Sequence, residues 1–129
     1  MSSAAPRSTC TNVTVRVIRG SAAQGIEFAA LQFSNAGKKA CELYGYPMAT
    51  LRLQGKQIGT PAQPATTATS AMKLAPGGTA ESRLVDYVSC QAPLSDSVRV
   101  VVPGSTIHTV RPAQLRACVL RVGKLGQPE

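Results

Sequence analysis

Four widely separated cysteines constrain this chain more than any other feature of its sequence. They are Cys10, Cys41, Cys90 and Cys118, and the gaps between them are 31, 49 and 28 residues. Structural zinc usually takes cysteines in close pairs, because one tight turn then presents two thiolates to a tetrahedral ion. The wide spacing therefore disfavours a metal site and favours disulfides, which form and persist in oxidising compartments.

A catalytic thiol is a weaker alternative, because it needs a neighbouring base and His108 is the only histidine of the chain. Four cysteines allow three disulfide pairings. The alternating segment 13–19 and the segment 26–34 predict a β-hairpin, and the residues before and after such a hairpin lie at the same end of it. We therefore expect Cys10 to pair with Cys41.

The same geometry predicts the second disulfide. A late hairpin is expected to turn at Pro103-Gly104-Ser105, and Cys90 and Cys118 each lie fourteen residues from Gly104. The two cysteines are therefore expected to meet at the open end of this hairpin and form a disulfide. By the loop-closure estimate, cross-links of this size stabilise a domain by roughly 3–4 kcal/mol each.

Apolar and β-branched residues alternate with polar ones in short runs between Gly, Pro and Asn clusters, which predicts an all-β chain. Within 26–34, Ile26 and Phe28 fall on one face of an alternating strand, whereas Leu31 and Phe33 fall on the other. An extra residue would bring both pairs to the same face, so we expect a bulge near Ala29-Ala30. Residues 112–116 suit a single helical turn. Predicted strands cover residues 13–19, 26–34, 49–53, 72–74, 80–85, 98–102, 106–110 and 119–122. This spacing favours a two-sheet antiparallel immunoglobulin-like β-sandwich of about 7–9 short strands.

A chain of 129 residues has the usual size of one domain. We expect an N-terminal linker at 1–9, one sandwich domain at 10–122 and a C-terminal tail at 123–129. The first residues are small ones behind an initiator Met, so we expect that a signal peptide, lipid anchor or membrane helix has been removed. The segment 59–70 is rich in Pro, Ala and Thr and is expected to be a mobile loop.

The basic charge of the chain suggests an anionic partner. Lys and Arg number 14 against 6 acidic residues, which gives a net charge of +8 at pH 7. Arg16, Arg99 and Arg121 have outward parity on predicted strands, and they would form one basic face if those strands were neighbours. Such a face suits phosphate, lipid headgroups or acidic polysaccharide, although a solvated surface that prevents edge aggregation explains the same residues. With two Phe and three Tyr, we expect no specific nucleic-acid partner.

Tyr44 and Tyr46 flank Gly45 in a segment that ends at Pro47. An exposed pair of tyrosines could form a recognition site, because aromatic residues are enriched at binding hot spots. Alternatively, Gly45 permits a tight bend, Pro47 directs the exit and one tyrosine anchors the loop to the core. We favour the structural role and keep both tyrosines as candidate binding residues.

The sequence does not predict an enzyme. It lacks the motifs G-x-S-x-G, H-E-x-x-H, G-x-x-x-x-G-K-[ST] and G-x-G-x-x-G. Asp86 and Asp96 could in principle pair two carboxylates for glycoside hydrolysis, with His108 as a further polar group, but no other residue supports this chemistry. We therefore expect no catalytic residue, no metal and no cofactor, and we keep a hydrolase as a minor alternative.

An ordered set of motifs links the chain to a known family. The segment Cys41 to Pro47 reads C-x-L-x-G-Y-P. The other matching elements are Asn35-Ala36-Gly37, Leu74-Ala75-Pro76-Gly77-Gly78, Val98 to Gly104, and Cys118. Over about residues 10–122, the chain resembles an uncharacterised actinobacterial family of secreted or lipid-anchored four-cysteine domains. The resemblance implies an immunoglobulin-like β-sandwich outside the cytoplasm, often behind a signal peptide or lipobox, and it carries over no catalytic residue.

These features predict a non-catalytic, extracytoplasmic binding module that is secreted or anchored to the cell envelope. Its partner would be a protein, glycan or lipid of the envelope or host. We expect a monomer that contacts a membrane only through the removed anchor. The loops 44–47 and 59–70 are the expected contact points, because mobile connections on a rigid sandwich often carry recognition. The alternative is a basic surface protein that binds an anionic glycan, lipid or nucleic acid.

Overall fold

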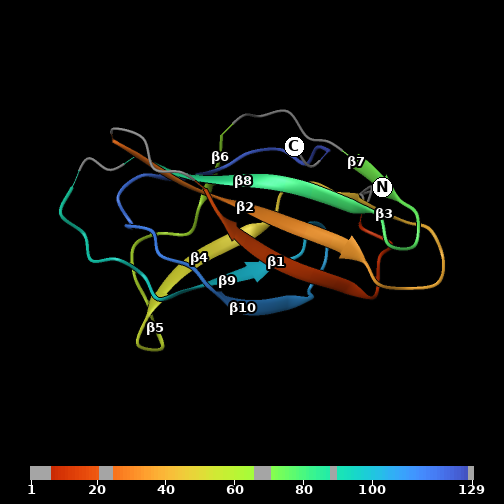
Figure 1. The fold of residues 1–129 in the computed structure, drawn as a ribbon, viewed down its shortest axis with the longest axis horizontal. Helices are drawn as coiled ribbons and strands as arrows, with labels where there is room; N and C mark the ends of the chain where they lie inside the picture. Colours follow the sequence, from red (N-terminus) through yellow and green to blue (C-terminus); the bar gives the residue numbers. More distant parts are fainter. Residues whose placement is uncertain (1–6, 21–24, 66–70, 88–89, 128–129) are drawn as a thin grey trace, which may run out of the picture.

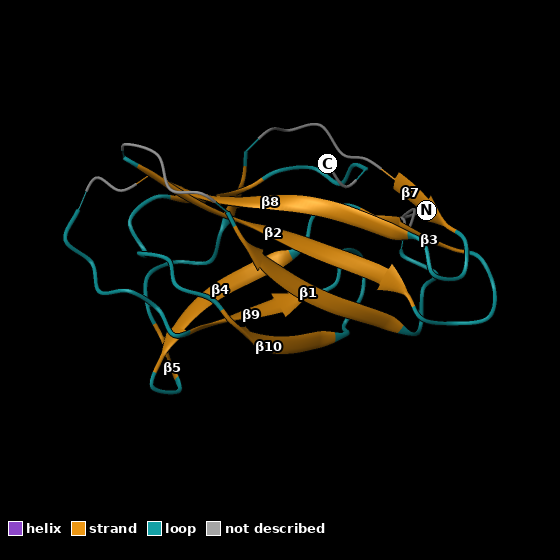
Figure 2. Ribbon diagram, in the orientation of Figure 1, coloured by secondary structure: helices purple, strands orange, loops and turns teal. Residues whose placement is uncertain are grey.

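The computed structural model describes residues 7–20, 25–65, 71–87 and 90–127. In these ranges the chain forms eleven strands and no helix (Figure 2), and thus no helix that is long and apolar enough to cross a membrane. The strands are β1 (Val13–Arg19), β2 (Ile26–Asn35), β3 (Cys41–Tyr44), β4 (Met48–Leu53), β5 (Lys56–Gln57), β6 (Gln63–Pro64), β7 (Ala71–Leu74), β8 (Thr79–Tyr87), β9 (Ser97–Val101), β10 (His108–Pro112) and β11 (Leu120–Val122). The all-β prediction is confirmed.

The strands form three open sheets (Figure 1). The largest has the order β1-β2-β8-β11-β6, and its neighbouring strands are antiparallel except for β11 and β6. The second has the order β10-β9-β4-β5 and is antiparallel throughout. The third pairs β3 with β7. Both predicted hairpins are present, as β1-β2 and as β9-β10.

Buried side chains of the two larger sheets form one apolar core. The five-stranded sheet contributes Leu31, Phe33 and Leu84, and the four-stranded sheet contributes Leu51 and Val98. Burial alternates residue by residue along most of β2 and β8, because successive side chains of a strand point to opposite faces. The side chains at the alternate positions therefore lie on the outer face of the sheet.

The predicted bulge near Ala29-Ala30 is wrong. β2 pairs with β1 in an unbroken register across these residues, with Ala30 opposite Ile18. Ala29 is buried in the core, whereas Phe28 lies on the outer face, where the Arg83 guanidinium carbon is 5.2 Å from the centre of its ring. The apolar residues of this segment therefore fall on both faces of the strand because Phe28 faces outwards, and the ladder contains no extra residue.

The predicted helical turn at 112–116 is also wrong. Pro112 is the last residue of β10, and the residues after it bond to the segment before β9. The Ser95 hydroxyl donates to the Ala113 carbonyl (2.7 Å) and accepts a hydrogen bond from the Leu115 N–H (3.0 Å). These long-range bonds replace the local bonds that a helical turn would need.

Part of the predicted mobile loop at 59–70 is a strand. Gln63–Pro64 forms β6, which runs parallel to β11, and the Ala65 N–H then donates to the Val122 carbonyl (2.8 Å). Pro64 fits this place because a two-residue strand at the edge of a sheet tolerates a missing N–H. Residues 66–70 lie outside the described residues, as do 1–6 of the predicted linker and 21–24 of the first hairpin turn.

The structure contains the disulfides Cys10–Cys41 and Cys90–Cys118, which is the pairing that the hairpin geometry predicts. Their Cα atoms lie 4.9 Å and 5.7 Å apart, within the usual range. Cys10 is buried in the core, whereas Cys90 is exposed. Two disulfides are typical of an oxidising, extracytoplasmic location.

Asn35 connects three segments at the end of β2. Its side-chain amide donates to the carbonyls of Lys39 (2.8 Å) and Leu74 (3.2 Å), and its side-chain oxygen accepts the Gly37 N–H (2.9 Å). The Asn35 carbonyl accepts the Gly77 N–H (2.8 Å). One buried side chain therefore ties the turn after β2 to β7, and the backbone beside it ties β2 to the turn before β8. These contacts give the Asn-x-Gly and Pro-Gly-Gly motifs a structural role.

Candidate functional site

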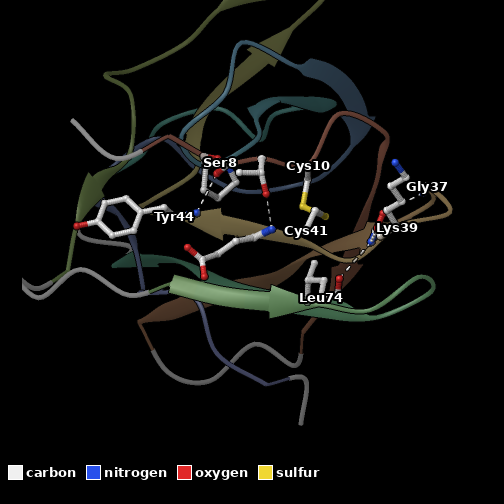
Figure 3. The surroundings of a disulfide bond; sticks show 11 residues. Ser8, Cys10, Gly37, Lys39, Cys41, Tyr44 and Leu74 are labelled. Atoms are coloured by element: carbon white, nitrogen blue, oxygen red, sulfur yellow. Dashed lines mark hydrogen bonds between the residues drawn. A yellow bond between two sulfur atoms is a disulfide. The ribbon is translucent and has the colours of Figure 1, made fainter. Parts of the chain in front are cut away.

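Ser8 joins two loops at the end of the molecule that carries the Cys10–Cys41 disulfide. Its hydroxyl accepts the N–H of Tyr44, the last residue of β3 and the one that precedes the β3-β4 loop (2.8 Å; Figure 3). The same hydroxyl donates to the Pro103 carbonyl in the β9-β10 loop, and the Ser8 N–H donates to the Gly104 carbonyl (3.1 Å). The segment before β1 therefore holds the β3-β4 and β9-β10 loops in one place.

Gly104 permits this close approach. Its φ of +63° is in the left-handed region, and a Cβ at this position would lie 2.7 Å from both the Ser8 hydroxyl and the Tyr44 carbonyl. A larger residue would be strained in φ and would push the loops apart. The Pro103-Gly104 turn is thus part of the junction as well as the end of a hairpin.

The two candidate tyrosines lie on opposite sides of Gly45 and have different surroundings. Figure 3 shows the Tyr44 ring pointing away from the Cys10–Cys41 disulfide. Tyr46 packs against the apolar core, and Pro47 after it is fully buried. Both tyrosines are half-buried. Tyr46 therefore anchors the loop, and it also lines a groove on the surface.

A groove of about 780 Å³ lies beside Tyr46. Its apolar lining comes from the loops that Ser8 joins and from the adjoining ends of β4 and β9. The apolar side chains include Tyr46, Met48, Val101 and Ile107, and the polar ones include Arg7, Thr11 and Thr106. The Met48 side chain is 56% exposed. An open groove with a mainly apolar lining and a few polar residues is a usual form of a surface that takes a protruding group of a partner.

Sequence reasoning found Tyr46 but missed the rest of this groove. Met48 could have been found, because it shares its parity with Thr50 and Arg52 and is thus an apolar residue on an otherwise polar face. Val101 and Ile107 carry no such signal. Val101 reaches the groove because β4 pairs with β9, which places Met48 opposite Val101, and the carbonyl of Ile107 accepts the N–H of Val102 next to it (2.8 Å).

The three candidate arginines would form one basic face only if their strands were neighbours, and the strand order does not meet this condition. Arg16 on β1 and Arg121 on β11 lie on the outer face of the five-stranded sheet, with β2 and β8 between them. Arg99 lies on β9 in the other large sheet. The structure instead places Arg83 of β8 between Arg16 and Arg121. Arg83 has outward parity in its predicted strand, but only the strand order shows that it joins the other two.

The polar residues of the hydrolase alternative are also dispersed. Asp86 lies in the five-stranded sheet, whereas Asp96 precedes β9 and His108 starts β10. Asp96 and His108 lie at opposite ends of the β9-β10 hairpin. The Asp96 carboxylate accepts the Gln54 N–H (2.9 Å), and this bond lowers its pKa, so its role is to hold the β4-β5 turn. Among the described residues, no group of three or more His, Cys, Asp and Glu residues could hold a metal ion.

Asp86 is a fully buried carboxyl group. One oxygen accepts the N–H groups of Val119 (3.0 Å) and Cys118 (3.3 Å), and the other makes no hydrogen bond within the described part of the chain. Burial raises the pKa of Asp86 above its ordinary value of 3.8; the two backbone bonds oppose this shift, and Glu27, its partner on β2, adds to it. Asp86 thus holds the Cys118 segment and β11 against β8.

We expect Asp86→Asn to be more stable than the wild-type protein at pH 7. Because the pKa of Asp86 is raised in the folded state, the wild-type protein loses stability as the pH rises from the unfolded-state pKa to the folded-state pKa. Asparagine keeps the acceptor oxygen and has no proton to lose. Denaturant titrations should show the difference at pH 7 and little difference at pH 3.

A second variant keeps this test informative. Asp86→Ala removes the acceptor of both backbone N–H groups, and we expect it to lose about 1–3 kcal/mol of unfolding free energy at either pH. If Asp86→Asn were no more stable than the wild type at pH 7, burial of a charged carboxylate would not be the dominant feature of this position.

A family model described as Domain of unknown function (DUF4232) matches residues 9–125. This range contains both disulfides, every described strand, and the two loops that Ser8 joins. Ser8 itself lies one residue before the range. No curated protein matches the chain, and no solved structure matches it.

Proposed function

We propose that this chain, which belongs to the DUF4232 family of domains of unknown function, is a non-catalytic binding module that is secreted or anchored to the cell envelope. The two disulfides support a place outside the cytoplasm. The observation that carries the binding role is the groove beside Tyr46, where the exposed Met48 side chain lies on an apolar floor. Its partner would be a protein of the envelope or host.

The strand order supports an immunoglobulin-like sandwich as the scaffold of this module. One sheet contains the series β1-β2-β8 and the other contains β10-β9-β4, which correspond in chain order to strands A-B-E and G-F-C of that fold. In such sandwiches the loops at one end commonly carry recognition. The β3-β4 and β9-β10 loops, which border the groove, would be the equivalent loops here.

Three properties of the groove favour a protein partner. The groove is open and apolar, so it suits a protruding apolar side chain of a folded or extended protein segment. Arg7 is its only charged lining residue, so the groove offers little to a highly charged ligand. The Ser8 hydrogen bonds and the nearby disulfide keep the loops in position before a partner arrives, so little conformational entropy is lost on binding.

Photo-crosslinking tests this proposal at the level of single positions. A photoreactive amino acid at Met48 should capture a specific protein from envelope or host extracts, and the same group at Leu94 should not. Leu94 is a matched control because it is a similarly exposed apolar residue, 40% exposed, that does not line the groove.

The captured protein should then depend on the apolar floor. We expect Met48→Lys to weaken binding of that protein by about tenfold or more, because a buried ammonium would have no partner there. Leu94→Lys should leave the affinity within about twofold. Equal capture at both positions, or capture at neither, would contradict the assignment of the groove.

A further inference from the structure

The outer face of the five-stranded sheet is open to solvent. Each outward side chain of β1, β2, β8 and β11 keeps at least partial exposure. Figure 1 shows β1, β2 and β8 side by side, and the strand order adds β11 beyond β8. This face is separate from the groove, whose strands belong to the other large sheet. It is also the only place where the described strands bring three arginines onto one sheet face.

The three arginines follow a diagonal line across the sheet. Arg121 is opposite Val85, which lies two residues from Arg83 on the same face of β8. Arg83 in turn lies two residues from Glu81 on β8. Glu81 is opposite Gln32 on β2, and Gln32 is opposite Arg16 on β1. With strands about 4.8 Å apart and a rise of about 3.3 Å per residue, the Cα separations along this line are about 8 Å and about 12 Å.

The middle of this line is held in place from below. The Arg83 guanidinium lies over the Phe28 ring, 5.2 Å from its centre, an arrangement that a cation–π attraction stabilises. The backbone of Gly20 packs on the same ring so closely that a Cβ there would lie 2.1 Å from a ring carbon. Phe28 is therefore a covered support and not an exposed stacking platform. A charged sheet face that is open to solvent suits a long ligand that lies across it more than a small ligand that needs enclosure.

The charges on this face are predominantly positive. On the outward positions of β1, β2, β8 and β11 the arginines Arg16, Arg83 and Arg121 are accompanied by one acidic residue, Glu81. Tyr87, at one end of β8, is 47% exposed and offers a ring edge or face to a sugar. A line of separated cations beside one exposed aromatic residue matches a linear chain that bears an anionic group on its repeating units.

We propose that this face binds a linear polyanionic polysaccharide, whose carboxylate or phosphate groups pair with Arg16, Arg83 and Arg121 while the chain runs diagonally across the sheet. Duplex nucleic acid fits less well, because a five-stranded sheet is wider than the helix or two-stranded ribbon that a groove of the duplex admits. A lipid bilayer fits less well, because the arginines follow a line, and Ile18, the exposed aliphatic residue of this face, lies to one side of that line. This site is independent of the groove and of its protein partner.

Polygalacturonate is the first probe for this proposal, because it is linear and carries one carboxylate on each sugar. We expect the triple variant Arg16→Gln, Arg83→Gln, Arg121→Gln to bind it about thirtyfold more weakly than the wild-type protein at low salt. The matched control removes the same charge from elsewhere, with Arg99→Gln, Lys56→Gln and Lys73→Gln. This control should weaken binding by less than about threefold.

A substitution with the opposite sign makes the test sharper. Glu81→Gln removes the acidic residue of this face and should strengthen polygalacturonate binding by about two- to threefold, whereas Glu42→Gln on β3 should not. Glu42 is exposed and belongs to a different sheet. A thermal unfolding curve for each variant shows whether the fold is retained.

Several outcomes would overturn the proposal. Equal weakening by the two triple variants would show that only the overall charge attracts the polymer. Tighter binding to duplex DNA or to phosphatidylglycerol vesicles than to polygalacturonate would assign the face to another class of polyanion. Binding of neutral dextran as tightly as polygalacturonate would exclude a role for the arginines.

Discussion

Replacement of Asn35 by alanine is expected to lower the free energy of unfolding by about 3 kcal/mol. The side chain is buried and makes three hydrogen bonds, to Gly37, Lys39 and Leu74. Alanine would leave an N–H and two carbonyls without these partners, and the Leu74 carbonyl lies where the bond is fully buried, so the loss exceeds that of an ordinary surface bond. Chemical denaturation of the purified, oxidised protein measures it.

Two further variants show whether hydrogen bonding is the cause. Asn12→Ala removes an exposed asparagine whose side chain makes one long bond, 3.4 Å, to the Ala36 carbonyl, and it should change stability by less than about 0.5 kcal/mol. Asn35→Asp keeps the shape but turns the donor into an acceptor that faces two carbonyls. We therefore expect it to be destabilised at pH 7, and wild-type stability for this variant would refute the role of the amide.

The second large effect is expected from the Cys10–Cys41 disulfide. Its loop of 31 residues and the 28-residue loop of Cys90–Cys118 give nearly the same loop-closure estimate, about 3–4 kcal/mol each. The two bonds nevertheless have different surroundings, because Cys10 is buried and Cys90 is exposed. We expect the double serine variant at 10 and 41 to lose about 1 kcal/mol more than the one at 90 and 118, since it places polar groups in the core.

The first variant should also disturb the groove. The Cys10–Cys41 bond holds the segment that contains Ser8 next to β3, and Ser8 joins the loops that border the groove. Hydrogen exchange at the Tyr44 N–H should therefore accelerate in the serine variant at 10 and 41 and remain slow in the variant at 90 and 118. Equal acceleration in both variants would show that the loops depend on overall stability and not on the local disulfide.

Much of the secondary structure could be read from local patterns. The alternation in Val13–Arg19 and the run Val98–Val102 correspond to β1 and, within one residue, to β9. The structure of short segments depends more on distant contacts than on the local pattern. Gln63–Pro64 became a strand because β11 lies beside it, and its own composition indicates only a loop. Residues 112–116 do not form the helical turn that their sequence suits, because their backbone groups bond to the distant Ser95 segment.

The candidate sites show the same division between local and distant information. The sequence offers Tyr46 as a candidate binding residue, and Tyr46 lines the groove, but Met48 and Val101 meet only because β4 pairs with β9. Outward parity was correct for Arg16, Arg99 and Arg121 as single residues. It did not indicate their neighbours, because parity repeats every two residues within one strand and carries no information about which strands share a sheet.

The sequence alone determined the β class of this protein, the two hairpins and the cysteines that lie at their open ends. These features follow from residues close together in the chain, where periodicity and turn residues act directly. Only the tertiary structure decided that Arg83 joins Arg16 and Arg121, that Arg99 lies on the other sheet, and that Ser8 joins two loops beside a groove. Those relations depend on which strands pair, and the paired strands lie far apart in the sequence. The pairing is selected by the burial of their apolar faces in one core, and the local sequence pattern does not specify it.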